Sequence, residues 1–177
     1  MTIPLFMKSP ASLLFAAVLV TSGCQSANQP ASVPVIDNVT VSFQEPDNFT
    51  DVSDSFGGST SQYYLDLISE HLKKTATGRL AEGQKLKVIF TDIDLAGDIP
   101  PGRIDNVRFV QSIYIPRMQL TFELKDAKGT TLRQGERRLI DLDFQSKMTS
   151  FMDRNEPLNY DKEMLADWVK REFPLKG

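Results

Sequence analysis

The sequence predicts a two-layer α+β domain, in which two helices pack on one face of a mainly antiparallel sheet of about four strands, in the order β-α-β-β-β-α. Three observations predict this fold. Apolar residues alternate with polar ones in four short segments, and they recur at helical spacing in two longer ones. A body of this length can also bury a core without disulfides, and the chain has a single cysteine.

The first predicted strand and helix are separated by a polar loop. Alternation predicts a strand over Val39–Phe43, and the stretch Glu45–Ser61, rich in Asp, Asn, Ser and Gly, predicts a loop. Ser59 and Gln62 fit a capping box at the start of a helix, and Gly78 offers its end. The apolar stripe of this helix consists of Tyr64, Leu65, Ile68, Leu72 and Ala76.

Three further strands are predicted from alternation. The first covers Lys85–Phe90, and the strongest covers Ile113–Lys125, where Met, Leu and Phe share one face. The turn Asp126–Gly129 leads into the partner strand Thr130–Phe144, with Gly where the chain needs a positive φ. Pro116 in the long strand indicates either a sheet edge, which could accept a strand from a partner, or a strand start.

The last predicted element is a helix over Tyr160–Phe173. Asn159 offers a cap before it, and Pro174 ends it. Its apolar stripe consists of Met164, Leu165, Trp168 and Val169. The sequence therefore predicts a second amphipathic helix for the same face of the sheet.

The N-terminal region is typical of a targeting signal followed by a tether. The apolar run Ala11–Val20 has the length of a signal-peptide core and is too short to span a membrane. It ends in small residues before Cys24, which resembles the lipobox of bacterial lipoproteins, although Thr21 stands where an aliphatic residue is usual. We therefore expect a signal peptide over 1–23, a lipidated Cys24 with a tether over 24–34, and one domain over 35–177. Either Met1 or Met7 could be the initiator.

This resemblance implies a location as well as a modification. It implies a protein anchored in the cell envelope by acyl chains and facing the periplasm, and Gln25 after the cysteine favours the outer membrane. Two or three acyl chains would hold the protein on a membrane stably.

Composition excludes several classes of function. The formal net charge is −3, so a nucleic-acid binder is disfavoured and binding of the domain itself to anionic lipid is opposed. One Cys and one His exclude a Cys/His zinc site built from this chain alone. The predicted lipidation of Cys24 leaves no free thiol for a Cys–His nucleophile pair. We expect no cofactor and no resident metal.

A run of carboxylates is the most distinctive chemical feature. Asp92, Asp94 and Asp98 lie at the end of a predicted strand, and carboxylate oxygens are ligands for hard cations. An EF-hand loop is excluded, because Ala96 and Arg103 stand where it needs carboxylate or amide ligands. The run therefore predicts a cation or small-ligand site of another type, a carboxylate-based hydrolase, or a network of arginine–carboxylate pairs.

Two more carboxylates and several arginines belong to the same hypothesis. If the strands are neighbours, Asp141 and Asp143 could join the cluster. The predicted counter-charges in such a network are Arg103, Arg108, Arg117, Arg137 and Arg138.

Two other motifs carry weaker signals. Gly57-Gly58-Ser59 could cradle an anion before a helix, but it lacks the pattern of a phosphate-binding loop, so a flexible loop with a cap is favoured. His71, the only histidine, lies on the edge of the helical stripe, where packing is favoured over catalysis.

Four blocks of the sequence together resemble one protein family. The four blocks are Thr91–Gly97, Ile115–Leu120, Gly135–Leu139 and the segment from Asn155 to Trp168. They are similar to a proteobacterial family of unknown function, domain-of-unknown-function family 3016, over about Val39 to Phe173. The resemblance implies a secreted or lipid-anchored envelope protein. It implies no activity and no catalytic residues.

Together these observations predict a non-enzymatic envelope lipoprotein that binds a protein partner in the periplasm. The alternative is a small-ligand or cation-binding module that uses the region of Asp92, Asp94 and Asp98. A carboxylate-based hydrolase is a third hypothesis.

Overall fold

The computed structural model describes residues 37–102, 105–146 and 156–175. The predicted signal peptide and tether, with the lipidation site Cys24, lie outside the described residues. The element order in the rest confirms the predicted β-α-β-β-β-α pattern. No helix among the described residues is long and apolar enough to cross a membrane.

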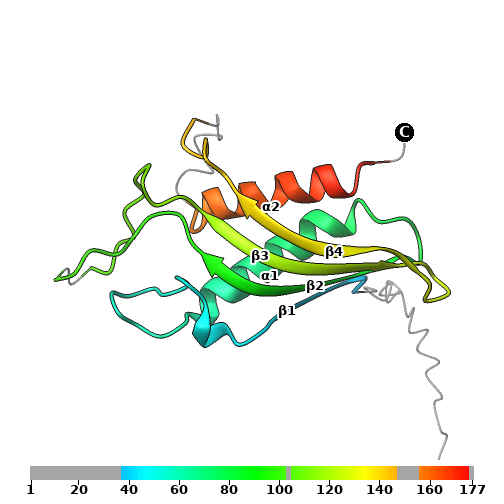
Figure 1. The fold of residues 1–177 in the computed structure, drawn as a ribbon, viewed down its shortest axis with the longest axis horizontal. Coiled ribbons are helices and arrows are strands. Elements are labelled where there is room, and N and C mark those ends of the chain that lie inside the picture. Colours follow the sequence, from blue (N-terminus) through cyan, green and yellow to red (C-terminus); the bar gives the residue numbers. More distant parts are fainter. Residues whose placement is uncertain (1–36, 103–104, 147–155, 176–177) are drawn as a thin grey trace, which may run out of the picture. The chain divides into compact units, whose positions relative to one another are not determined.

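Four strands form one mixed sheet in the order β1-β2-β3-β4 (Figure 1). β2 pairs antiparallel with β3, β3 pairs antiparallel with β4, and only β1 pairs in parallel with β2. A parallel pair needs a crossover, and the helix α1 supplies it. The strands are β1 (Val39–Phe43), β2 (Lys85–Asp94), β3 (Arg117–Lys125) and β4 (Thr131–Ile140).

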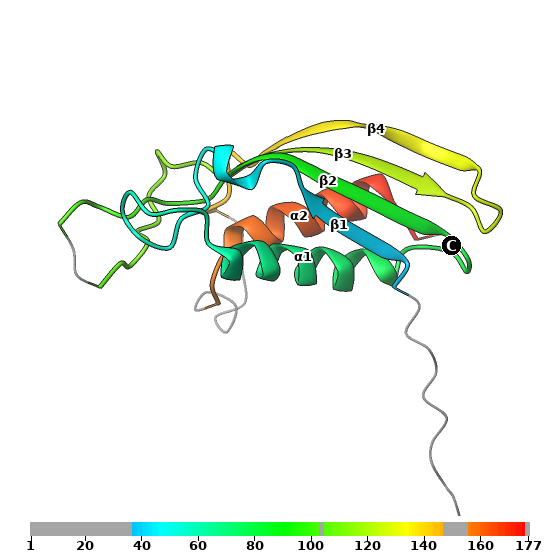
Figure 2. The ribbon, with the colours of Figure 1, turned by 90° about the horizontal axis from the view of Figure 1, so that it is seen from below.

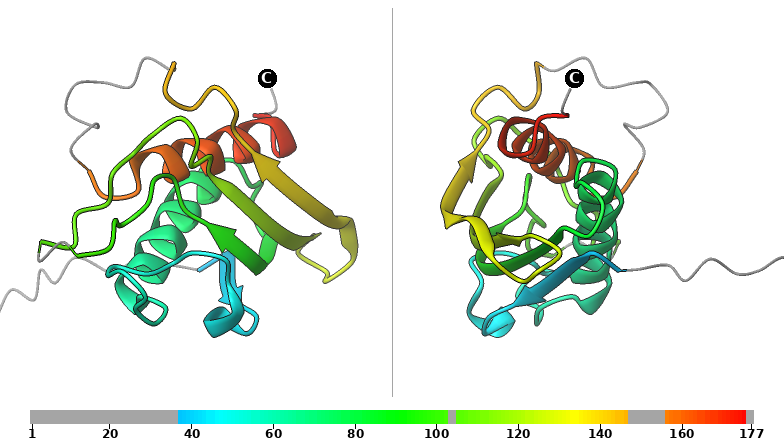
Figure 3. Two further views of the ribbon diagram at one scale, coloured as in Figure 1. Left: turned by 60° about the vertical axis from the view of Figure 1, so that its left-hand side comes forward. Right: turned by 90° about the vertical axis from the view of Figure 1, so that its right-hand side faces the viewer.

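Both helices cover the same face of this sheet (Figures 2 and 3). α1 (Gln62–Thr77) lies beside β1, and α2 (Asn159–Glu172) lies beside β4. The predicted stripes are the ones that pack inward, and both helices contribute four buried apolar side chains or more to one core. Alternation predicted the inner face of β3 correctly, since Met118, Leu120, Phe122 and Leu124 are all buried.

Several boundaries differ from the sequence prediction. β2 continues to Asp94, because an extra residue, Thr91, bulges out between Phe90 and Asp92 and restores the inward position of Ile93. β3 begins at Arg117 and lies between two strands, so Pro116 marks a strand start and not an edge.

Both predicted helix caps are wrong by one or two residues. Ser61, and not Ser59, caps α1, accepting a hydrogen bond from the Tyr64 N–H at 3.4 Å. Asn159 is the first residue of α2, and Leu158 precedes it in a left-handed conformation with no side-chain cap. Gly78 does end α1, and a short 3₁₀ turn, η1 (Pro46–Asn48), lies in the predicted loop.

The two ends of the domain are built differently. At the hairpin end lie the β3–β4 turn, the starts of β1 and β2, and the C-terminal ends of both helices (Figure 2). At the loop end lie the segments 45–61, 95–102, 105–116 and 141–146, with the starts of both helices (Figure 1).

Candidate functional site

A buried arginine organises the loop end. The guanidinium of Arg108 donates to both carboxylate oxygens of Asp51, at 2.7 and 3.0 Å. It also donates to the carbonyl oxygens of Gly97, at 2.9 Å, and Ser53, at 2.8 Å. Its side chain is only 10% exposed. Burial by itself lowers the pKa of Arg108, but the hydrogen bonds and charge of Asp51 outweigh burial and hold it above its ordinary value.

The segment around Gly97 brings Arg108 into place. Asp98 and Phe109 exchange backbone hydrogen bonds of 3.0 and 2.8 Å, so the chain doubles back on itself here. Gly97 has φ +84°, and a Cβ at this position would meet the Phe109 carbonyl oxygen at 2.6 Å. Glycine is therefore required at position 97 for the segments around Gly97 and Phe109 to approach each other.

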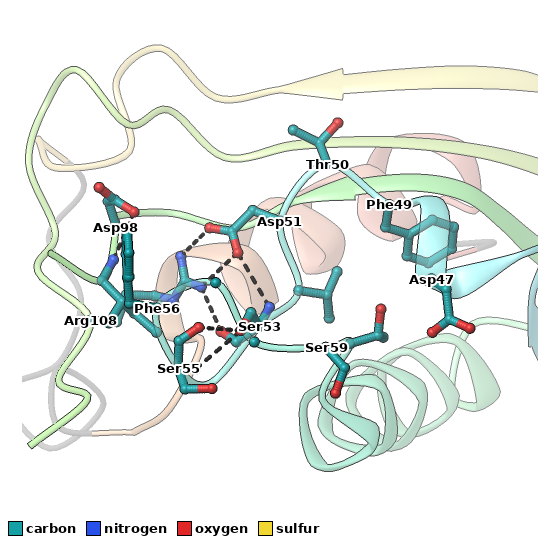
Figure 4. Close-up of a pocket in the computed structure, with 15 residues that line it drawn as sticks. Asp47, Phe49, Thr50, Asp51, Ser53, Ser55, Phe56, Ser59, Asp98 and Arg108 are labelled. Atoms are coloured by element: carbon teal, nitrogen blue, oxygen red, sulfur yellow. Dashed lines mark hydrogen bonds and ion pairs between the residues drawn. The ribbon is translucent and has the colours of Figure 1, made fainter. Parts of the chain in front are cut away.

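A cavity of about 420 Å³ lies beside this arginine (Figure 4). Residues 47–60 form most of its wall, with Asp98, Ile99 and Arg108 on the other side. Asp51 and Ser53 turn toward the guanidinium (Figure 4). The Arg108 guanidinium is thus already bonded to Asp51 and Ser53. The cavity wall also carries Asp47, Asp51 and Asp98, so the surroundings do not favour binding of an anion.

This geometry favours the structural interpretation of Gly57-Gly58-Ser59. The three residues line the same cavity, and the predicted cap is supplied two residues later by Ser61. The Ser61 hydroxyl in turn donates to Asp54 at 2.8 Å. A negatively charged loop beside an arginine whose two terminal nitrogens already donate to Asp51, Gly97 and Ser53 is a poor anion cradle.

A buried carboxyl lies between the start of α2 and the segment after β2. Asp161 is 1% exposed and accepts a hydrogen bond from the Ala96 N–H at 3.1 Å. Burial raises the pKa of Asp161 to about 7, against the opposing effects of this bond and of the charge of Arg108. A small cavity of about 200 Å³ adjoins it, with Tyr64, Arg108 and Asn159 in its wall. Burial also raises the pKa of Tyr64.

Exposed apolar side chains gather at the loop end. Ile113 is 69% exposed and Leu142 is 72% exposed. The segments that carry them are bonded to each other, since the Asp141 N–H donates to Pro116 O at 3.4 Å. Among the described residues, the exposed large apolar side chains of this end are Phe56, Tyr63, Val107, Val110, Ile113, Tyr114, Ile140 and Leu142.

The predicted carboxylates of β2 have structural partners. Asp92 accepts hydrogen bonds from the N–H and the hydroxyl of Thr50, at 2.8 and 3.1 Å. Asp94 forms an ion pair of 2.9 Å with Arg117, as the predicted network requires, and burial raises its pKa. Both side chains therefore tie the loop end to the sheet.

The predicted cluster of four strand carboxylates does not form. It requires β2 and the last strand to be neighbours, but β3 lies between them. β4 also ends at Ile140, so Asp141 and Asp143 follow the strand and belong to the next loop. Asp98 accepts a bond from the Ile99 N–H at 2.8 Å. Within 37–102, 105–146 and 156–175, no group of three or more His, Cys, Asp or Glu side chains could hold a metal ion.

The remaining predicted residues are dispersed. Arg103 lies outside the described residues, and Arg138 is exposed on β4 opposite Gln119. His71 is half-buried, its ring nitrogen lies 3.4 Å from the Thr75 hydroxyl, and burial lowers its pKa. It lies on α1, away from the cavity beside Arg108.

Sequence reasoning found Arg108 only as one of several counter-charges and missed its partner. Asp51 lies in a loop far from Arg108 in the sequence, so no spacing connects them. Asp161 was missed because an acid in the first turn of a helix is usually solvated. The sequence signal for its burial is its position three residues before Met164, which puts both residues on the inward face of α2.

Comparisons with known proteins give one result. A family model described as "Protein of unknown function (DUF3016)" matches residues 37–171. A search of the curated proteins returns no match.

Proposed function

Because the chain belongs to the DUF3016 family of proteins of unknown function, we propose that it is a non-enzymatic lipoprotein of the cell envelope whose loop end binds a protein partner. The anchor is the predicted lipidated Cys24, and we place the domain in the periplasm, at the outer membrane. We assign the binding function to the described domain, which the family match covers almost entirely.

The observation that carries the proposal is the group of exposed apolar side chains at the loop end. Monomeric proteins rarely expose large apolar patches unless they bind something. Ile113 and Tyr114 precede Pro116, and Leu142 follows Asp141, so the hydrogen bond from the Asp141 N–H to Pro116 O holds their two segments together. Arg108 precedes Ile113 and Tyr114 on the same segment and bonds that segment to Gly97 and Ser53.

The negative charge of the loop end indicates which charge the partner surface should carry. The segment 45–61 carries Glu45, Asp47, Asp51 and Asp54 and no Lys or Arg. A partner surface with an apolar centre and basic residues around it would complement this end, and such charges raise association rates.

The test is photo-crosslinking in cells that express the full-length protein. Probes replace Tyr114 and Leu142 at the loop end, and a control probe replaces Leu132, which is also exposed but lies at the hairpin end. We expect one envelope protein to be captured from both loop-end probes and not from Leu132. Equal capture from all three positions, or none from any, would overturn the proposal.

A variant separates binding from folding. Ile113→Glu should reduce capture from the Leu142 probe at least tenfold, since a change at a central hot-spot residue costs about 2 kcal/mol of binding or more. Its thermal midpoint should stay unchanged, because Ile113 is exposed. Loss of the folded state in this variant would leave Leu142→Glu as the second measurement.

A further inference from the structure

We propose that the hairpin end of the domain docks on a bilayer surface rich in anionic phospholipid. The observation is that unpaired cations and an apolar groove occur together at this end. The inference goes beyond partner binding, which uses the opposite end of the molecule.

Four cations at the hairpin end have no ion pair among the residues that the structure describes. They are Lys74, Lys85, Lys128 and Arg171, and all four are exposed. Lys74 and Arg171 lie near helix C-termini, where the helix dipole favours cations. Lys85 and Lys128 have no such explanation.

Lys85 occupies a position that folding alone disfavours. It lies directly opposite Lys125 in the β2–β3 pairing, and like charges in such cross-strand pairs destabilise a sheet. Lys125 has its own partner, Glu123, at 3.0 Å. The ammonium of Lys85 is therefore left for solvent or for a ligand.

Most carboxylates at this end are already engaged. Asp37 pairs with Lys73 at 3.0 Å, and Asp126 accepts bonds from the N–H groups of Lys128 and Thr130. Glu172 is held by Arg133 and Arg137. Glu82, together with Asp126, which accepts from these backbone N–H groups, opposes this surface charge. The local surface is thus basic although the whole chain is acidic.

An apolar groove opens among these cations. Its volume is about 550 Å³, and its wall includes Leu80, Leu124, Leu132, Phe173 and Leu175, with Arg79 and Arg133 beside them. Leu132 and Leu175 are 47% and 64% exposed. Apolar side chains next to Lys and Arg are typical of surfaces that enter the headgroup region.

Distance explains why the net charge of −3 does not oppose this docking. The acidic loops lie at the far end of β2, whose ten residues span about 33 Å. Charges at physiological ionic strength are screened over about 8 Å. The loop-end carboxylates therefore contribute little to the potential at the hairpin end.

The chain also enters the described domain at this end. Asn38 accepts a hydrogen bond from the Leu86 N–H, next to Lys85. Asn38 is 14 positions after Cys24 in the sequence, and a chain of that length reaches at most about 50 Å. The proposed anchor would then hold the basic end, and not the loop end, close to the membrane.

The test uses the mature full chain with Cys24→Ser, so that no acyl chain contributes. Flotation is measured with vesicles of phosphatidylcholine alone and with equal parts of phosphatidylcholine and phosphatidylglycerol. We expect binding only to the vesicles that contain phosphatidylglycerol, and loss of binding at high salt. Equal binding to both vesicles, or binding to neither, would overturn the proposal, and neither result bears on crosslinking from the loop end.

Matched charge reversals locate the surface. Lys128→Glu should weaken binding about 30-fold, at a factor of about five for each unit of charge. Arg138→Glu changes the net charge equally but lies near the far end of β4, and it should have little effect. Equal loss in both variants would mean that total charge, and not this surface, governs binding.

A third variant tests the apolar part. Leu132→Ser with Leu175→Ser should weaken binding while keeping its salt dependence, because the charges are unchanged. Both side chains are exposed, so the fold should persist. Unchanged vesicle binding would contradict insertion of the groove rim.

Discussion

The loop end buries a cation beneath an acidic surface, whereas the hairpin end buries an anion beneath a basic one. At the loop end Arg108 is 10% exposed and is bonded to Asp51 and two carbonyl oxygens. At the hairpin end the side chain of Glu172 is 8% exposed, and Arg133 and Arg137 approach it from β4. Each buried charge has more than one partner, as its desolvation requires.

The two arrangements stabilise different things. Glu172 joins α2 to β4, two elements that already share an apolar core with Phe122, Trp168 and Phe173. Arg108 joins the turn at Gly97 to the segment 45–61, in which Val52 is the one buried apolar side chain. The ordering of the loop end therefore depends on one polar hub, which is the guanidinium of Arg108 with its hydrogen-bond acceptors. The ordering of the hairpin end depends on apolar packing, to which the ion pairs of Glu172 add.

The largest effect is expected from Arg108→Met. Removing the guanidinium leaves the partly buried Asp51 and two carbonyl groups without their donors, which should cost about 3–5 kcal/mol in the free energy of unfolding. Urea denaturation measures it, and hydrogen exchange should show early loss of protection in the loops. Arg117→Met, whose side chain is 42% exposed in its pair with Asp94, should cost less than about 1 kcal/mol. Similar costs for both would contradict the role of Arg108 as a hub.

The second effect is a pH dependence at the loop end. Burial raises the pKa of Asp161 to about 7, so the folded protein keeps a proton that the unfolded chain releases above about pH 4. This contribution to stability is present below pH 4 and is lost as the pH rises through 7. Between about pH 4 and pH 7 the unfolding free energy of the natural protein should fall on the order of 4 kcal/mol more than that of Asp161→Asn, which has no carboxyl at this position to titrate.

Denaturation at a series of pH values tests this. Asp37→Asn is the control, because Asp37 lies in an exposed pair with Lys73 at the other end of the domain. An unchanged pH profile in Asp161→Asn would show that the buried carboxyl is not the titrating group.

The third and smallest effect has the opposite sign and belongs to the hairpin end. Hydrogen bonds from Arg137, together with the charge of both arginines, lower the pKa of Glu172. Its stabilisation is present above the unfolded pKa and is lost as the pH falls through the folded one. Glu172→Gln should cost about 2 kcal/mol at neutral pH and much less in acid. Asp37→Asn, in an exposed pair, should leave stability unchanged at either pH.

Much of the fold could be predicted from the sequence because local periodicity encodes it. The alternation in β3 and the stripes of both helices reflect burial directly, so these elements were identified with their inner faces. The parallel pairing of β1 with β2 was not predicted, because strand order depends on contacts between distant segments. The caps were misplaced because several polar residues precede each helix and only one can take the capping geometry.

The candidate site was largely beyond sequence reasoning for the same reason. Arg117 and Asp94 face each other across neighbouring strands, a relation that alternation can suggest. The pairing of Arg108 with Asp51 depends on two irregular loops meeting in space, and irregular backbone has no period. The segregation of charge between the two ends is likewise invisible in a net charge of −3.

The parallel strand β1 has a consequence for the order of folding. β2, β3 and β4 are consecutive in the chain and are neighbours in the sheet, and a short turn joins β3 to β4. β1 can join only after the long crossover through residues 44–84 has closed, at a larger cost in chain entropy. The segment 45–61 is part of that crossover, so we expect the loop end to be the last region to assemble and the first to open.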